Sequence, residues 1–146
     1  MRAHVLPVAL AVPVVLASCG ADDAPPPPVT FSMTVRVEAG QELLACQFVK
    51  MPDADGEIFV SGGSYETGQG MHHFLLFRTA PDMPPQPLNQ PVDCNEGAGV
   101  MQYERGYVSG GMLERDNADF PFGLALPFAS GEVLMMQSHI VNASPT

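Results

Sequence analysis

The chain has 146 residues, of which 46% are hydrophobic and 15% charged, with 6 Lys and Arg against 16 Asp and Glu. Its formal net charge of −10 argues against nucleic-acid binding, which needs clustered cations facing phosphates. The 15 prolines and 14 glycines exclude a helical bundle, because each proline inside a helix costs about 3 kcal/mol. A chain of this length and composition predicts one turn-rich, all-β domain.

The beginning of the chain predicts an export signal. Residues 5–17 form an almost unbroken apolar run, which is shorter than the about 20 residues that a membrane-spanning helix needs. The run ends in Leu16-Ala17-Ser18-Cys19-Gly20, which resembles a bacterial lipobox. That resemblance implies a signal peptide over residues 1–18 and a lipid on Cys19. The alternative is an ordinary signal peptide in which the cysteine is incidental.

A lipidated Cys19 implies a membrane-anchored lipoprotein of the bacterial cell envelope, facing the periplasm or the exterior. Residues 19–29 include four consecutive prolines, which favour an extended polyproline II tether. The globular domain is therefore expected over residues 30–146.

Short apolar segments separated by turn signals predict the strands of this domain. Residues 31–37 alternate between apolar and polar side chains, which is typical of a half-buried strand. Further strand-length runs cover residues 43–49, 58–61, 71–77, 100–103, 122–128 and 133–141. Turn signals lie at residues 53–56, 61–64 and 109–111, and a surface loop with five prolines is expected at 81–91. This spacing predicts a β-sandwich or jelly roll.

Two cysteines remain in the predicted domain, Cys46 and Cys94. In an exported domain an even number of cysteines favours a disulfide. The alternative is a copper site that uses one thiolate.

The three histidines of the domain, His72, His73 and His139, all lie within apolar strand segments. Because a buried imidazole costs free energy unless its nitrogens are satisfied, a shared transition metal would explain all three. Adjacent residues of a regular strand point to opposite faces, so His72 and His73 can share a metal only at a bulge or a strand end. Gly68 and Gly70 make a bulge plausible. The alternative is one core histidine and two surface ones.

Other metal ligands are scarce near these histidines. The nearest carboxylates in the sequence are Glu66 and Glu132, both at expected turns. Thioethers are a further alternative, although methionine more often fills gaps in cores; the candidates are Met71, Met135 and Met136. The sequence contains no nucleophile elbow, no His-Glu-x-x-His and no phosphate-binding glycine loop, so no catalytic residue is assigned.

The segment Met71–Phe77 resembles the His-His-Met-Leu-Leu-Phe signature of the copper type II, ascorbate-dependent monooxygenases. This family includes peptidylglycine α-hydroxylating monooxygenase and dopamine β-monooxygenase. Other family motifs are matched in the same order, at residues 44–52, 93–97, 120–124 and 137–139. The resemblance covers about residues 30–142.

The resemblance implies a jelly-roll domain that holds one copper through His72, His73 and His139, with a disulfide between Cys46 and Cys94. The family's second copper is bound by two histidines and a methionine in a following domain. Compared with the family, this sequence is expected to lack that domain and the last strands of the first one. The resemblance therefore implies the electron-storing half of a copper- and ascorbate-dependent monooxygenase. An electron donor and a second copper-domain protein would be its partners. The alternatives are a copper-handling module without turnover and a truncated, degenerate monooxygenase fragment.

Overall fold

The computed structural model describes residues 27–95 and 99–145, and this part of the chain is all-β apart from one short 3-10 helix. The predicted signal peptide, Cys19 and most of the expected tether lie outside the described residues. The elements in chain order are β1 (Glu42–Lys50), β2 (Ile58–Val60), β3 (Gly62–Glu66), β4 (Met71–Thr79), β5 (Val92–Asp93), η1 (Val100–Tyr103), β6 (Glu104–Gly111), β7 (Arg115–Asp119), β8 (Leu126–Phe128) and β9 (Val133–Val141). None of the helical structure in these ranges is long and apolar enough to cross a membrane.

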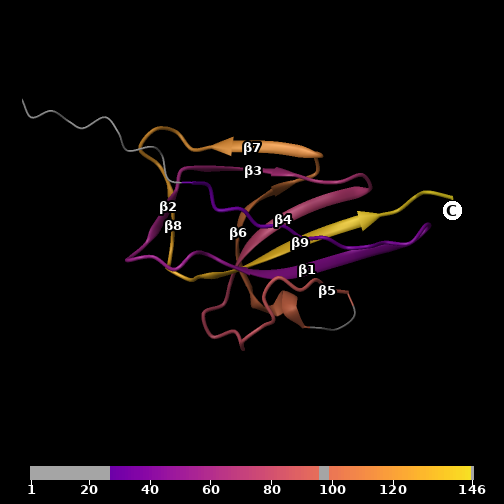
Figure 1. The fold of residues 1–146 in the computed structure, drawn as a ribbon, viewed down its shortest axis with the longest axis horizontal. Helices are drawn as coiled ribbons and strands as arrows, with labels where there is room; N and C mark the ends of the chain where they lie inside the picture. Colours follow the sequence, from indigo (N-terminus) through magenta and orange to yellow (C-terminus); the bar gives the residue numbers. More distant parts are fainter. Residues whose placement is uncertain (1–26, 96–98, 146) are drawn as a thin grey trace, which may run out of the picture.

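A five-stranded antiparallel sheet in the order β5-β1-β9-β4-β6 forms the centre of the domain. The strand β9 lies between β1 and β4, and each of these two strands pairs with it over nearly its whole length. The pair β3–β7 lies above this sheet in Figure 1, and the pair β2–β8 lies to its left. Strands β1 and β4, far apart in sequence, are therefore fixed to the same partner.

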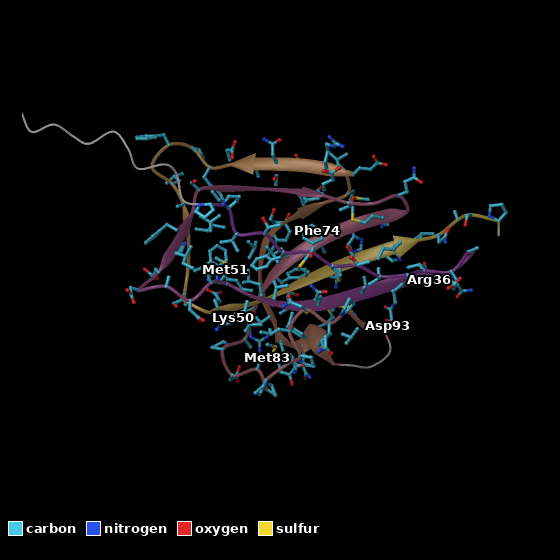
Figure 2. All side chains as sticks on the ribbon, viewed as in Figure 1. Arg36, Lys50, Met51, Phe74, Met83 and Asp93 are labelled. Carbon is cyan, nitrogen blue, oxygen red and sulfur yellow. A yellow bond between two sulfur atoms is a disulfide. The ribbon has the colours of Figure 1, made fainter. Side chains whose placement is uncertain are left out.

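Apolar side chains pack on both faces of the large sheet. On one face, which we call the η1 side, Phe48, Phe77 and Met135 pack with Val100 of η1. On the other face, the β3 side, Val49, Leu134 and Met136 pack with Phe128 and other apolar residues. Figure 2 shows the labelled Phe74 and Met83 on opposite sides of the sheet, in agreement with their membership of these two clusters. The sheet is thus the middle layer of the molecule.

The strand predictions with the strongest apolar patterns are confirmed. Residues 43–49, 71–77 and 133–141 correspond to β1, β4 and β9, and residues 58–61 to β2. The described chain is all-β, as its composition predicts. The jelly-roll connectivity and the missing strands stay predictions.

The expected strand at residues 31–37 is not paired with any strand in the described chain. The alternating burial is as predicted, because Phe31 and Met33 pack into the cluster on the β3 side. Side chains bind the backbone of this segment: Gln47 Nε2 donates to the Ser32 carbonyl at 2.7 Å and Asn142 Nδ2 to the Val37 carbonyl at 2.8 Å. An apolar–polar alternation indicates which side chains of a segment are buried, but it does not show that the segment pairs with another strand.

Four further predictions of local structure are wrong, the last of them in part. Residues 61–64 and 109–111 are not turns but lie largely within β3 and β6. Gly110 has a φ of 141°, and a Cβ there would collide with the carbonyl of Phe74 on β4, so glycine serves close strand pairing rather than a turn. Residues 100–103 form η1 instead of a strand, and only residues 126–128 of the run 122–128 are a strand. A four-residue apolar run does not distinguish a strand from a helical turn.

Candidate metal centre

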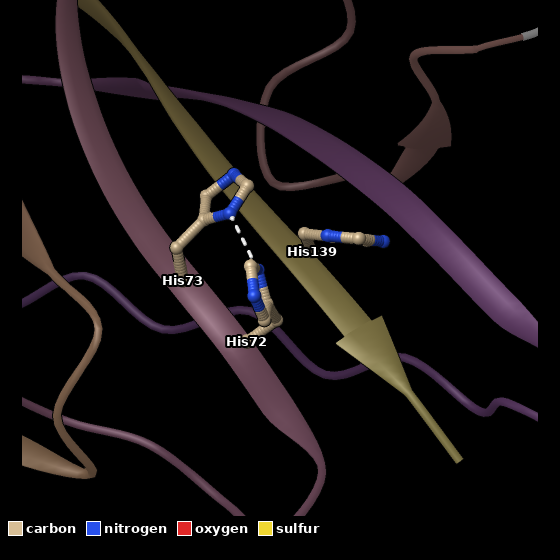
Figure 3. Close-up of side chains that lie close together, drawn as sticks. All are labelled: His72, His73 and His139. Carbon is tan, nitrogen blue, oxygen red and sulfur yellow. Dashed lines mark hydrogen bonds between the residues drawn. The ribbon is translucent and has the colours of Figure 1, made fainter. Parts of the chain in front are cut away.

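The three histidines of the domain converge at one end of the large sheet. His72 and His73 lie near the start of β4, and His139 lies near the end of β9. One ring nitrogen from each lies within 4.8 Å of the other two, and the ring centroids are 5.2 to 5.6 Å apart. Figure 3 shows the three rings gathered on the same side of the two strands. The predicted histidine cluster is therefore present in the structure.

A bulge in β4 brings the two adjacent histidines together. His73 lies directly opposite His139, while Met71 lies opposite Ile140, so β4 has one extra residue, His72, between these pairs. In a regular strand His72 would point away from His73; the extra residue changes the local backbone direction. Just before the bulge, Gly70 has a φ of 81°, and its carbonyl accepts the Val141 N–H at 2.7 Å. The bulge predicted from the His-His sequence is thus confirmed.

The spacing of the two β4 nitrogens suits a metal ion. His72 Nδ1 and His73 Nδ1 are 3.3 Å apart. Two nitrogens bound at 2.0 to 2.1 Å to a tetrahedral ion such as zinc are about 3.3 to 3.4 Å apart. The His139 side chain is 25% exposed, and one of its ring nitrogens lies within 4.8 Å of those of His72 and His73. The residues present therefore fit a three-imidazole site.

The chemistry of this site is set by its donors and by its access to solvent. Three neutral imidazoles suit copper, zinc, nickel or iron. His72 is exposed and His73 half-buried, so the cluster is open on one side. On the same face of the sheet as His139, Leu44 lies opposite that histidine, and Leu75 lies opposite the buried Gln137. A metal here would have at least one position free for an exchangeable ligand.

The carboxylates singled out from the sequence are engaged elsewhere. Glu66 pairs with Arg115 at 3.2 Å, and Glu132 pairs with Arg78 at 3.1 Å. Neither belongs to the histidine cluster.

Two of the expected thioether candidates are part of the apolar core. Met135 and Met136 are buried in the two core clusters on opposite sides of the sheet. Met71 lies opposite Ile140, whose side chain faces away from that of His139 because successive residues of a strand alternate. The geometry therefore favours imidazole ligands alone.

One acidic residue at the site is not predicted by the sequence pattern. Glu42 Oε2 lies 3.5 Å from His139 Nε2, and its side chain is 68% exposed. Glu42 begins β1, which is far from β4 and β9 in sequence. Only the pairing of β1 with β9 brings it to the cluster, so the strand register is the one signal that points to it.

The cysteine pair is bonded in the structure. Cys46 and Cys94 form a disulfide with a Cα–Cα distance of 5.6 Å, and Cys46 is fully buried. The backbone N–H of Cys94 also donates to the Leu44 carbonyl at 2.8 Å. The disulfide fixes the segment around β5 to β1, and it argues against the copper–thiolate alternative.

No protein-family model, curated protein sequence or solved structure matches this chain.

Proposed function

We propose that the protein binds a single copper ion through His72, His73 and His139 and uses it to store and pass an electron. The convergence of three imidazoles across a bulge carries this proposal. The ordered motifs that resemble the copper type II monooxygenases support it further. When bound, copper would supply one-electron chemistry between Cu(II) and Cu(I).

The donor set favours copper over the other candidates. Among the divalent first-row metals, nitrogen sites bind Cu²⁺ most tightly, ahead of Ni²⁺ and Zn²⁺. Within the described residues, the ligand atoms that lie within 4.8 Å of one another all belong to histidines, and Glu42 contacts only His139. In this proposal the two strands hold the three rings, and the open side admits a reductant.

A complete oxygenation reaction would need a second metal site. In residues 27–95 and 99–145, this histidine cluster is the one group of His, Cys, Asp and Glu side chains arranged for a metal. The proposed role is therefore the electron-storing half of a copper- and ascorbate-dependent monooxygenase. Its partners would be an electron donor and a second copper-domain protein. A lipid at Cys19 would hold it at the surface of a bacterial cell envelope.

A copper-handling module without turnover is the second candidate. The exposure of His72 favours it, because an open site permits ligand exchange with an acceptor. Transfer of copper to a chelating acceptor, faster than dissociation of the ion into buffer, would support this role over electron storage.

Competition titrations with Cu(II), Cu(I) and Zn(II) test the proposal. We expect one equivalent of each copper state to bind, with Cu(II) tighter than Zn(II), and ascorbate to reduce the bound ion. Oxygen consumption with ascorbate should not exceed that of an equal amount of copper bound to a model imidazole complex, since residues 27–95 and 99–145 supply one candidate metal site. Failure to bind copper in a folded sample would contradict the proposal, and sustained oxygen consumption would contradict the need for a partner.

A further inference from the structure

The start of β1 places a carboxylate beside His139. In the β1–β9 ladder Leu44 lies opposite His139, and Glu42 lies opposite Val141. Alternate residues of a strand share a face, so Glu42 projects on the side of the sheet that carries His139. A diagonal neighbour across two strands is within reach of a long side chain, and Glu42 Oε2 is 3.5 Å from His139 Nε2.

The position of Glu42 bears on which nitrogen of His139 can bind a metal. A neutral imidazole carries one N–H and one lone pair, and a carboxylate only accepts hydrogen bonds. A proton on Nε2, directed to Glu42, leaves the lone pair on Nδ1. In Figure 3 the His139 ring extends away from the rings of His72 and His73, so the far end of the His139 ring points away from the other two histidines.

We infer that Glu42 is a positioning residue of the metal centre, which fixes His139 in the tautomer whose Nδ1 binds the ion. This inference rests on the proposed function. Metal-bound histidines commonly donate their second N–H to a carboxylate, and loss of that partner typically costs 10- to 100-fold in metal affinity. Glu42 is suited to the role because its one ion-pair contact within the described residues is His139.

The other acidic side chains near β1 do not compete for this position. Glu38 pairs with Arg36 at 2.8 Å, and both side chains are largely exposed. Glu38 therefore provides a matched control, since its removal takes away the same charge from the same part of the surface without touching a histidine.

The test compares Glu42→Ala, Glu42→Gln and Glu38→Ala in the full chain. In the metal-free protein, long-range ¹H–¹⁵N correlation spectra should show the His139 proton on Nε2 in the wild type and in Glu38→Ala. In Glu42→Ala the proton should redistribute between the two nitrogens. Cu(II) affinity should fall about 10- to 100-fold in Glu42→Ala. It should fall less in Glu42→Gln, whose amide oxygen still accepts a hydrogen bond, and should not change in Glu38→Ala.

The outcomes separate this inference from the proposed function. If the wild type binds no metal, the proposed function fails. If the wild type binds copper and Glu42→Ala binds it equally tightly, or the His139 proton lies on Nδ1, the inference is overturned. The loss of a direct ligand would change the copper EPR parameters, whereas a residue that acts through His139 leaves the set of bound nitrogens unchanged. A change of that kind in Glu42→Gln would therefore also overturn the positioning role.

Discussion

His73 on β4 lies directly opposite His139 on β9, and one extra residue in β4, His72, precedes this pair. The two strands are central members of a five-stranded sheet, so the backbone holds the pair rigidly. The position of His72 depends instead on the local bulge. The geometry of the cluster is therefore as sensitive to the backbone at residues 70–73 as to the histidines themselves.

Gly70 should be required for this bulge. Its φ of 81° is unfavourable for other residues, and a Cβ there would lie 2.8 Å from the Val141 carbonyl oxygen. We expect Gly70→Ala to lower the free energy of unfolding by about 1–2 kcal/mol and to weaken metal binding. Gly68→Ala is the matched control, because nothing lies within 4 Å of a Cβ at Gly68. Urea denaturation and a metal titration measure both effects, and equal behaviour of the two variants would contradict this account of the bulge.

A bound metal should stabilise the fold, because His73 and His139 lie on neighbouring strands. A ligand at 100 times its dissociation constant raises the free energy of unfolding by about 2.7 kcal/mol if it does not bind the unfolded chain. Thermal unfolding with Zn(II), which has no redox chemistry, should show an increase in Tm that a chelator reverses. The increase should disappear in His73→Ala and persist in Gln69→Ala, a change at an exposed neighbour. Equal stabilisation of both variants would place the metal elsewhere.

The disulfide should contribute to stability more than to metal binding. Cys46 and Cys94 are separated by 48 residues, and a cross-link that closes such a loop is worth about 2–4 kcal/mol. The double variant Cys46→Ala/Cys94→Ala should unfold at a correspondingly lower urea concentration. Its copper affinity at a temperature where it remains folded should match the wild type, because β1 still pairs with β9 over nine residues. A large loss of copper affinity in the folded double variant would revive the thiolate alternative.

The unpaired N-terminal segment should stabilise the β3 side of the core. Phe31 and Met33 are half-buried against it, so Phe31→Ser and Met33→Ser should each lower the free energy of unfolding by about 1 kcal/mol. Thr34→Ser, at an exposed position of the same segment, should have little effect. Chemical denaturation of the three variants provides the measurement, and three equal midpoints would show that the segment does not contribute to the core.

The sequence predicts those elements whose burial pattern is long and continuous. The nine-residue run at 133–141 forms β9 with the expected bounds, and the His-His pair in β4 correctly implies a bulge. Both inferences depend on local geometry, namely the alternation of side chains along a strand. The grouping of His72, His73 and His139 depends instead on their chemistry, because three imidazoles in apolar segments need a common partner for their nitrogens.

The features that the sequence does not predict depend on contacts between distant segments. The sequence around Gly110 has the pattern of a turn. The glycine is in fact required by the close approach of β6 to β4, and the neighbouring residues do not indicate that approach. The proximity of Glu42 to His139 follows from the β1–β9 register, and register is a tertiary property. Residues 31–37 show the predicted alternation, yet the fold gives them no partner strand among the residues that the structure describes.

Electron paramagnetic resonance during a Cu(II) titration of the wild type and of His139→Ala tests the central claim most directly. A single copper site formed by His72, His73 and His139 predicts one equivalent of a type 2 signal with nitrogen hyperfine structure. In His139→Ala the spectrum should change and the affinity should fall. A folded wild-type protein that binds no stoichiometric copper, or a spectrum that His139→Ala leaves unchanged, would contradict the assignment.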